Sequence, residues 1–266
     1  PVIPVIKAIF FLGIIISIKL NVLNQTILLK MQKNKCYILK NFKMRDNLVK
    51  FSSILLYFLP AALISGPLIS DIILSVVALI FIFLSAKEKL WKYYKNNFFY
   101  IFSAFYFYIL CRTLLSEDPS LALINSLFYF RFGIFSLAVW YLIDNNSDLI
   151  KRFFFVLSIT LFILIFDAFI QIIFGQSLFG MEMDSGMGWR YSGLFGDEAI
   201  LGSYLSKILL LYFALMLFSN IRTKFLNYIF FIIFVSGFGL IYMSGERTAF
   251  FVTLITFIVV FIMLEE

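Results

Sequence analysis

Long, uninterrupted apolar runs are the feature that most constrains this chain. Eight of them follow residue 50, at about 51–68, 70–85, 98–115, 121–143, 153–174, 199–219, 225–243 and 248–264. A helix needs roughly 20 apolar residues to cross a bilayer. Only helices and closed barrels can cross, because every backbone polar group must find a partner inside the structure. The runs are continuous rather than alternating, so they predict helices.

The composition agrees with a lipid environment. The chain is 62% hydrophobic and only 14% charged over 266 residues, whereas a soluble domain is nearer half apolar and a quarter charged. We therefore predict an all-α, polytopic transmembrane helix bundle with about eight spans. The first two runs meet at Gly66-Pro67 and are short, so they predict either two thin spans or one re-entrant hairpin.

The loop charges predict an orientation. If the runs alternate across the membrane, the basic segments 30–50, 86–97, 151–152 and 222–224 fall on one side and the acidic loops on the other. The positive-inside rule places the basic side in the cytoplasm. The net charge of +7 is then explained by topology, and we expect no nucleic-acid partner.

The two ends of the chain lie outside the main bundle. We expect residues 1–50 to form a separate segment, in which a short apolar run is either an extra span or sequence upstream of the native start, followed by a basic cytoplasmic stretch. The bundle itself covers 51–266, and the sequence stops directly after an apolar run. We expect the native protein to continue beyond it.

Residue usage excludes several kinds of chemistry. The chain has no His, so neither His acid/base catalysis nor His metal ligation can come from these residues. Cys36 and Cys111 lie in unlike contexts, a basic loop and an apolar run. We expect no disulfide, no metal site and no cofactor.

Five cations are not explained by topology: Arg112, Arg131, Arg190, Lys207 and Arg247. Arg131 lies near the middle of the run 121–143, and an arginine at membrane depth costs at least about 2.5–3.5 kcal/mol on insertion scales. An internal ion pair would offset this cost, and we expect Asp167 as the partner. Lys207 lies inside another run, where its side chain either snorkels outward or lines a site.

Arg190 and Arg247 stand in Gly-containing outer loops that lead into the next helix. Glycine allows close backbone approach to a ligand, a helix N-terminus attracts anions, and the Arg fork matches phosphate oxygens. The combination predicts a phosphate cradle. The alternative is a pair of capped turns in which Glu246 or Asp197 binds the arginine.

Both segments resemble a known family. Arg190-Tyr-Ser-Gly-Leu-Phe-Gly-Asp, followed by Gly202 at a helix start, resembles the R-x-S-G-x-F-G-(N/D) segment of the O-antigen ligase and polymerase superfamily. Ser244-Gly-Glu-Arg-Thr-Ala resembles its second element, a short turn that opens a helix. The order and spacing of the two segments and the aromatic-rich spans also fit, over roughly residues 44–266.

The resemblance implies a function in lipopolysaccharide or other polysaccharide biosynthesis. It implies a GT-C-like glycosyltransferase of the bacterial inner membrane that takes a glycan from undecaprenyl pyrophosphate at the periplasmic face. The acceptor would be lipid A core or another lipid-linked repeat unit.

In the family, arginines matching Arg190 and Arg247 hold the pyrophosphate. The candidate lining residues are Arg131, Asp167, Ser192, Gly193, Lys207 and Ser244. The family's catalytic His lies in a large periplasmic loop after a later span, so we expect this stretch of chain to be inactive alone.

Two other functions remain open from the sequence. A lipid-linked glycan flippase or other transporter would use Arg131, Lys207 and Asp167 along a polar path. A purely structural membrane subunit would leave Arg190 and Arg247 without a role.

Overall fold

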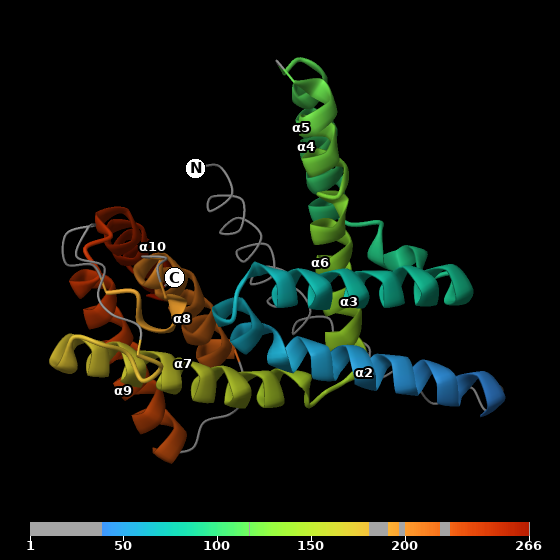
Figure 1. Ribbon diagram of the computed structural model, residues 1–266. Coiled ribbons are helices and arrows are strands. Elements are labelled where there is room, and N and C mark those ends of the chain that lie inside the picture. The colour runs from blue at the N-terminus through green and yellow to red at the C-terminus, as the bar shows by residue number, and fades with distance from the viewer. Residues whose placement is uncertain (1–38, 117, 181–190, 197–199, 219–223, 266) are drawn as a thin grey trace. The chain divides into compact units, whose positions relative to one another are not determined.

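The computed structural model describes residues 39–116, 118–180, 191–196, 200–218 and 224–265 (Figure 1). These residues form helices joined by short turns and contain no β-strand, which confirms the predicted all-α chain. The α-helices are α2 (Leu39–Ile64), α3 (Pro67–Glu88), α4 (Asn97–Leu114), α5 (Pro119–Leu127), α6 (Phe130–Asn145), α7 (Leu149–Phe174), α8 (Leu201–Phe218), α9 (Lys224–Met243) and α10 (Arg247–Glu265). The 3-10 helices η1 (Trp91–Tyr93) and η3 (Gly193–Phe195) lie in connections.

Several helices could cross a membrane, as predicted for a multi-pass membrane protein. Four candidates in the described chain are long and apolar enough: Met44–Ile64, Pro67–Glu88, Leu149–Phe174 and Leu226–Met243. Shorter apolar helices cover Leu201–Leu217 and Arg247–Val260. Only 22% of the span in α9 is buried within the protein, so most of its apolar surface is left for lipid. The total of eight spans and the GT-C-like architecture stay predictions.

The joint between the first two apolar runs separates two full-length helices. α2 has 26 residues and α3 has 22. Pro67 occupies the first position of α3, where its missing N–H is no loss because that amide has no intrahelical partner. The lengths favour two separate spans over one re-entrant hairpin.

The run 121–143 is not one continuous helix, which corrects our prediction. α5 ends at Leu127, and α6 begins at Phe130. The turn between them is closed by 3-10-type hydrogen bonds, from Tyr129 N to Ser126 O at 3.0 Å and from Arg131 N to Phe128 O at 3.3 Å. Arg131 therefore lies in the first turn of α6 and not in the middle of a span. Periodicity alone could not reveal this break, because the residues on both sides of it are apolar.

The chain divides into two compact units. Unit 1 comprises the residues up to Leu59 together with Leu68–Leu149, and unit 2 comprises Pro60–Pro67 and Ile150–Glu266. Each unit has its own buried side chains.

Aromatic rings hold one part of unit 1 together. Phe81 of α3, Tyr93 of η1 and Tyr141 of α6 pack against one another, with ring centroids 5.6–6.1 Å apart. Arg45 of α2 donates from Nε to the Tyr141 hydroxyl at 3.1 Å and pairs with Glu88 at 3.3 Å. The basic beginning of α2 is thus tied to the ends of α3 and α6.

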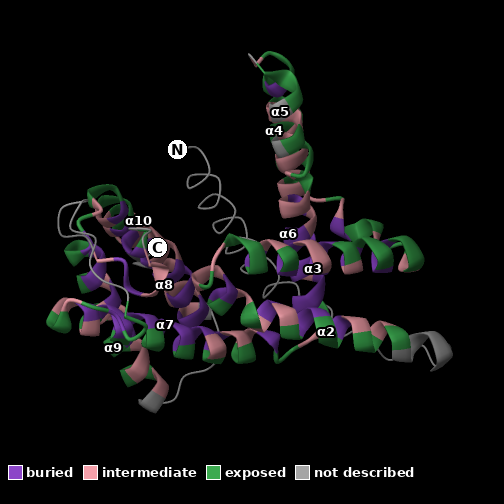
Figure 2. Cartoon of the chain, in the orientation of Figure 1, coloured by how far each residue is buried: buried purple, intermediate pink, exposed green. Residues whose placement is uncertain are grey.

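The α4–α5 pair carries few buried side chains. Thr113 is the buried residue of α4, and its hydroxyl lies 2.7 Å from that of Ser126 in α5. Most other positions of this pair are exposed or intermediate (Figure 2).

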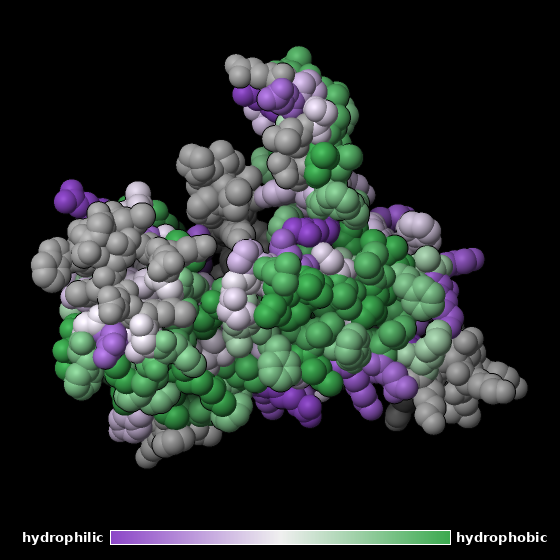
Figure 3. Space-filling model, in the orientation of Figure 1, coloured by the Kyte–Doolittle hydropathy of each residue, from purple (hydrophilic) through white to green (hydrophobic). Residues whose placement is uncertain are grey.

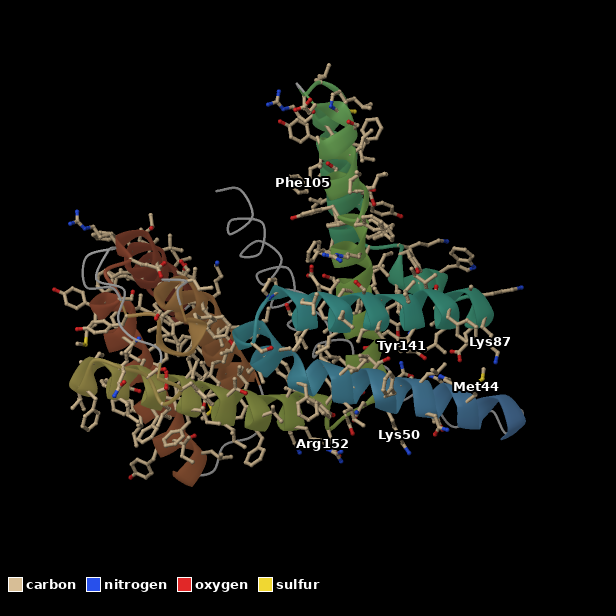
Figure 4. The ribbon with its side chains drawn as sticks, viewed as in Figure 1. Met44, Lys50, Lys87, Phe105, Tyr141 and Arg152 are labelled. Carbon is tan, nitrogen blue, oxygen red and sulfur yellow. The ribbon has the colours of Figure 1, made fainter. Side chains whose placement is uncertain are left out.

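Hydrophobic side chains cover the visible face of α3, while hydrophilic ones gather at its C-terminal end (Figure 3). Lys87 extends from this end of α3, and Lys50 extends from α2 (Figure 4). Apolar faces between charged helix ends are typical of spans in lipid.

Helices α7 and α8 run antiparallel in unit 2. Near the beginning of α7, Phe154 stacks on Tyr212 of α8 with centroids 4.8 Å apart, and Ser158 donates to the Tyr212 hydroxyl at 3.0 Å. α8 also packs against α9 and α10. The end of α7, the beginning of α8, the end of α9 and the beginning of α10 consequently meet. We call this region, which carries Asp167, Gly193, Gly202 and Ser244, the motif end of unit 2.

Candidate functional site

The predicted site residues fall into three groups. Arg190 lies outside the described residues. Arg131 belongs to unit 1, where it contacts α3. The remaining ones belong to unit 2: Asp167, Ser192, Gly193, Lys207, Ser244 and Arg247.

The first motif segment is anchored on α7. The Gly193 backbone N–H donates to Gln171 Oε1 at 2.8 Å, and Gln171 Nε2 donates to the Ser192 hydroxyl at 3.3 Å. All three residues are buried. Gly193 has φ +56°, a left-handed conformation that favours glycine. The predicted Ser192–Gly193 pair is therefore a buried turn.

Asp167 contacts the same connection. Its Oδ1 accepts the Leu178 backbone N–H at 2.8 Å, while its Oδ2 is buried and has no hydrogen-bond partner among the described residues. A Cβ placed on Gly193 would lie 3.5 Å from this Oδ2. The Asp167 carboxylate thus faces the α7–α8 connection both near its beginning, at Leu178, and near its end, at Gly193.

The predicted Arg131–Asp167 ion pair is wrong. Arg131 Nη2 instead lies 2.8 Å from Asp71 Oδ2 of α3, and its Nη1 lies 3.4 Å from the Ser75 hydroxyl. The break before α6 puts Arg131 in the first helical turn, from which it reaches α3. Asp71 lay within an apolar run, and a lone carboxylate in such a run was the available signal for this partner.

The second motif segment is the tight turn between α9 and α10. Ser244 is buried, and its hydroxyl donates to Ile241 O at 2.8 Å and accepts the Glu246 N–H at 3.4 Å. Arg247 begins α10 and is exposed. Its backbone N–H donates a hydrogen bond to Gly245 O at 3.1 Å. Within the described part of the chain, its guanidinium has no hydrogen-bond or ion-pair partner.

The two motif segments touch each other. A Cβ on Gly202 would overlap the Ser244 hydroxyl and lie 3.2 Å from Glu246 Cβ. The Ser203 hydroxyl donates to Glu246 Oε2, so Glu246 binds α8 and not the neighbouring Arg247. Lys207 lies four residues beyond Ser203 on α8, half-buried and on the same helical face.

Sequence reasoning missed three residues at this end of unit 2 or gave them another role. Gln171 and Ser203 were overlooked, and Glu246 was considered only as an acidic loop residue or as a partner for Arg247. Gln171 follows Asp167 by four residues in an otherwise apolar run. Two polar residues at helical spacing were the signal that could have found it.

The described residues hold no group of three Cys, Asp or Glu side chains able to bind a metal ion. What the motif end offers is an exposed guanidinium at a helix N-terminus, a buried carboxylate and several hydroxyl groups. No protein-family model, curated protein or solved structure matches the chain.

Proposed function

We propose that this protein transfers a glycan from undecaprenyl pyrophosphate to lipid A core or to another lipid-linked repeat unit. The motif end of unit 2 would face the periplasm, and the pyrophosphate would bind there. The proposal rests on the resemblance of two sequence segments to the O-antigen ligase and polymerase superfamily.

The contact between Gly202 and Ser244 is the observation that carries this proposal. Gly202 and Ser244 belong to different motif segments and lie 42 positions apart in sequence. The two residues are nevertheless so close that only a glycine fits between α8 and the Ser244 hydroxyl. A single binding site built from both segments requires such proximity.

Arg247 supplies the chemistry expected of an anion site. Its exposed side chain stands at the beginning of α10, a helix of 19 residues. The first amides of a helix lack intrahelical acceptors, and the helix dipole favours negative charge there. As the bond between the sugar and pyrophosphate breaks, negative charge grows on the departing phosphate. A fixed cation aimed at that charge stabilises the transition state.

The test uses the full-length gene in a bacterial host that lacks its own ligase or polymerase. Arg190 and Arg247 are replaced singly by Ala and by Lys, and surface glycan is followed on gels together with the amount of protein in the membrane. Arg152→Ala is the matched control, since Arg152 is exposed at the opposite end of α7. We expect both Ala variants to lose glycan at normal expression, Lys not to restore it, and the control to keep it. Normal glycan with either arginine replaced by Ala would refute a shared pyrophosphate site.

A transporter is the second candidate, and the break between α5 and α6 favours it. Broken helices often form substrate sites in transporters, and here the break lies beside the Arg131–Asp71 ion pair. Reconstituted vesicles separate the two functions. A transporter would move a lipid-linked glycan between leaflets without a change in its chain length, whereas a transferase would release undecaprenyl pyrophosphate.

A further inference from the structure

Two side chains of α7 hold both ends of the connection between α7 and α8. Asp167 Oδ1 accepts the Leu178 N–H at 2.8 Å, four residues after α7 ends. Gln171 Oε1 accepts the Gly193 N–H at 2.8 Å, and its Nε2 donates to Ser192 Oγ at 3.3 Å. One helix face therefore binds the connection near its beginning and near its end.

Burial makes these hydrogen bonds effective. Asp167 and Gln171 are both 0% exposed, and they lie four residues apart, one turn along the same face of α7. Water cannot replace a hydrogen bond that is lost inside the protein. The buried backbone N–H of Gly193 would then be left without an acceptor, which is unfavourable for a buried backbone group. The N–H of Leu178, an exposed residue, would lose a hydrogen bond that is partly buried.

We propose that Asp167 and Gln171 are positioning residues that clamp the described parts of the α7–α8 connection, at Leu178 and at Ser192–Gly193, onto α7. The clamp itself stands on the hydrogen bonds, while its consequence for pyrophosphate binding rests on the proposed function.

The clamp needs an acceptor atom at Asp167 and not a negative charge. Oδ1 makes the hydrogen bond to the connection, and Oδ2 has no partner in the part of the chain that the structure describes. Asp167→Asn keeps an oxygen in the position of Oδ1, whereas Asp167→Ala removes it. A general base or a cation ligand at this position would require the charge, so the two substitutions separate the clamp from those roles.

Hydrogen–deuterium exchange of the full-length protein in lipid nanodiscs tests the clamp without any assay of activity. The peptides of interest cover residues 175–180 and 191–196. We expect Asp167→Ala to accelerate exchange at Leu178, and Gln171→Ala to accelerate it at Gly193, by about fivefold to tenfold, as for the loss of one hydrogen bond. Asp167→Asn should stay within about twofold of the native protein, since it keeps the acceptor.

Ser158→Ala is the matched control. Ser158 is a buried residue of α7 whose hydroxyl binds Tyr212 of α8 and not the connection. This variant should leave exchange in both peptides unchanged. Equal exchange in Asp167→Ala, Gln171→Ala and Ser158→Ala would overturn the clamp. Exchange in Asp167→Asn as fast as in Asp167→Ala would also overturn it, because the charge would then be what matters.

Glycan synthesis by the same variants tests the consequence for function. We expect Asp167→Ala and Gln171→Ala to raise the KM for the lipid-linked donor more than they lower kcat, and Asp167→Asn to restore KM. If the native full-length protein makes no glycan, the proposed function fails while the exchange result still decides the clamp. If exchange responds but KM does not, the clamp holds the connection without positioning the donor, which overturns the proposed consequence.

Discussion

Gly202 lies directly against the Ser244 hydroxyl, so that the beginning of α8 and the turn before α10 leave no room for a side chain between them. Both residues are buried. Glycine is required here for close approach and not for an unusual backbone angle, because Gly202 lies within a regular helix. The stability of unit 2 should therefore depend on the size of the residue at this position.

We expect Gly202→Ala to destabilise the protein by about 1–3 kcal/mol, the usual range for forcing an extra methyl group into a packed site. The added Cβ would overlap Ser244 Oγ and press on Glu246. Thermal unfolding in detergent would show the loss as a lower Tm.

Gly239→Ala in α9 is the matched control, because a Cβ there meets nothing within 4 Å. Since alanine is the better helix former, this change should be neutral or stabilising by about 0.5–1 kcal/mol. Ser244→Ala removes the overlapping hydroxyl and should rescue part of the loss caused by Gly202→Ala. An equal Tm for the two glycine variants would show that the contact is not tight.

The sequence predicts the helices and the proximity of the two motif segments more readily than it predicts which side chains form ion pairs or hydrogen bonds with each other. Continuous apolar runs determine the all-α fold, and the two segments that resemble family motifs drew attention to Ser192, Gly193 and Ser244. Arg131 shows why partners are harder, since its contact with Asp71 depends on a break between two stretches that are equally apolar. Hydropathy does not register that break. Gln171 likewise binds residues more than 20 positions away, and no local pattern encodes such a contact.

The Arg131–Asp71 ion pair should contribute to stability in a membrane. The two side chains are 28% and 48% exposed, so in water the pair would contribute little. In lipid an unpaired charge costs more than in water, about 2.5–3.5 kcal/mol at the centre of a span on insertion scales and less toward a helix end, where Arg131 lies. We expect Asp71→Asn and Arg131→Gln each to lower the Tm and the yield of folded protein, and the charge-swapped double variant to recover part of both.

Asp148→Asn serves as the control for this ion pair, because Asp148 is exposed in the connection between α6 and α7. It should leave the Tm unchanged. If the charge-swapped double variant has a Tm as low as that of the single variants, the shape of the two side chains, and not their charge, determines this contact.

The hydrogen bond of Tyr93 should make the stability difference between the native protein and a Tyr93→Phe variant depend on pH. Burial raises the pKa of the Tyr93 phenol, and the nearby Asp144 carboxylate raises it further. The Tyr93 hydroxyl donates to Asp144 Oδ2 at 2.9 Å. The folded-state pKa of Tyr93 lies above the unfolded value of about 10. The contribution of Tyr93 to the stability of the folded protein is therefore complete below about pH 10 and is lost as the pH rises toward the folded-state pKa.

We expect Tyr93→Phe to cost about 1.5–3 kcal/mol at pH 7, the range for a hydrogen bond to a charged group. The Tm difference from the native protein should stay constant up to about pH 9 and shrink above about pH 10. Comparing the two proteins at each pH cancels the titration of the lysines, which they share. A difference that grows with rising pH would contradict the assigned hydrogen bond.

Ser203 and Glu246 provide the last test of how the two motif segments are joined. Glu246 Oε2 accepts from the Ser203 hydroxyl, while Oε1 is buried without a partner in the described residues. Ser203→Ala would remove the partner that Oε2 has in the described structure, at a cost of about 1–3 kcal/mol. Ser206→Ala removes a buried hydroxyl of α8 that binds within its own helix, at Ser203 O, so it should cost less. The loss caused by Ser203→Ala should shrink when Glu246 is also replaced by Leu, since no partly buried carboxylate is then left without its partner. An undiminished loss in the double variant would mean that Ser203 stabilises α8 itself and does not join the two segments.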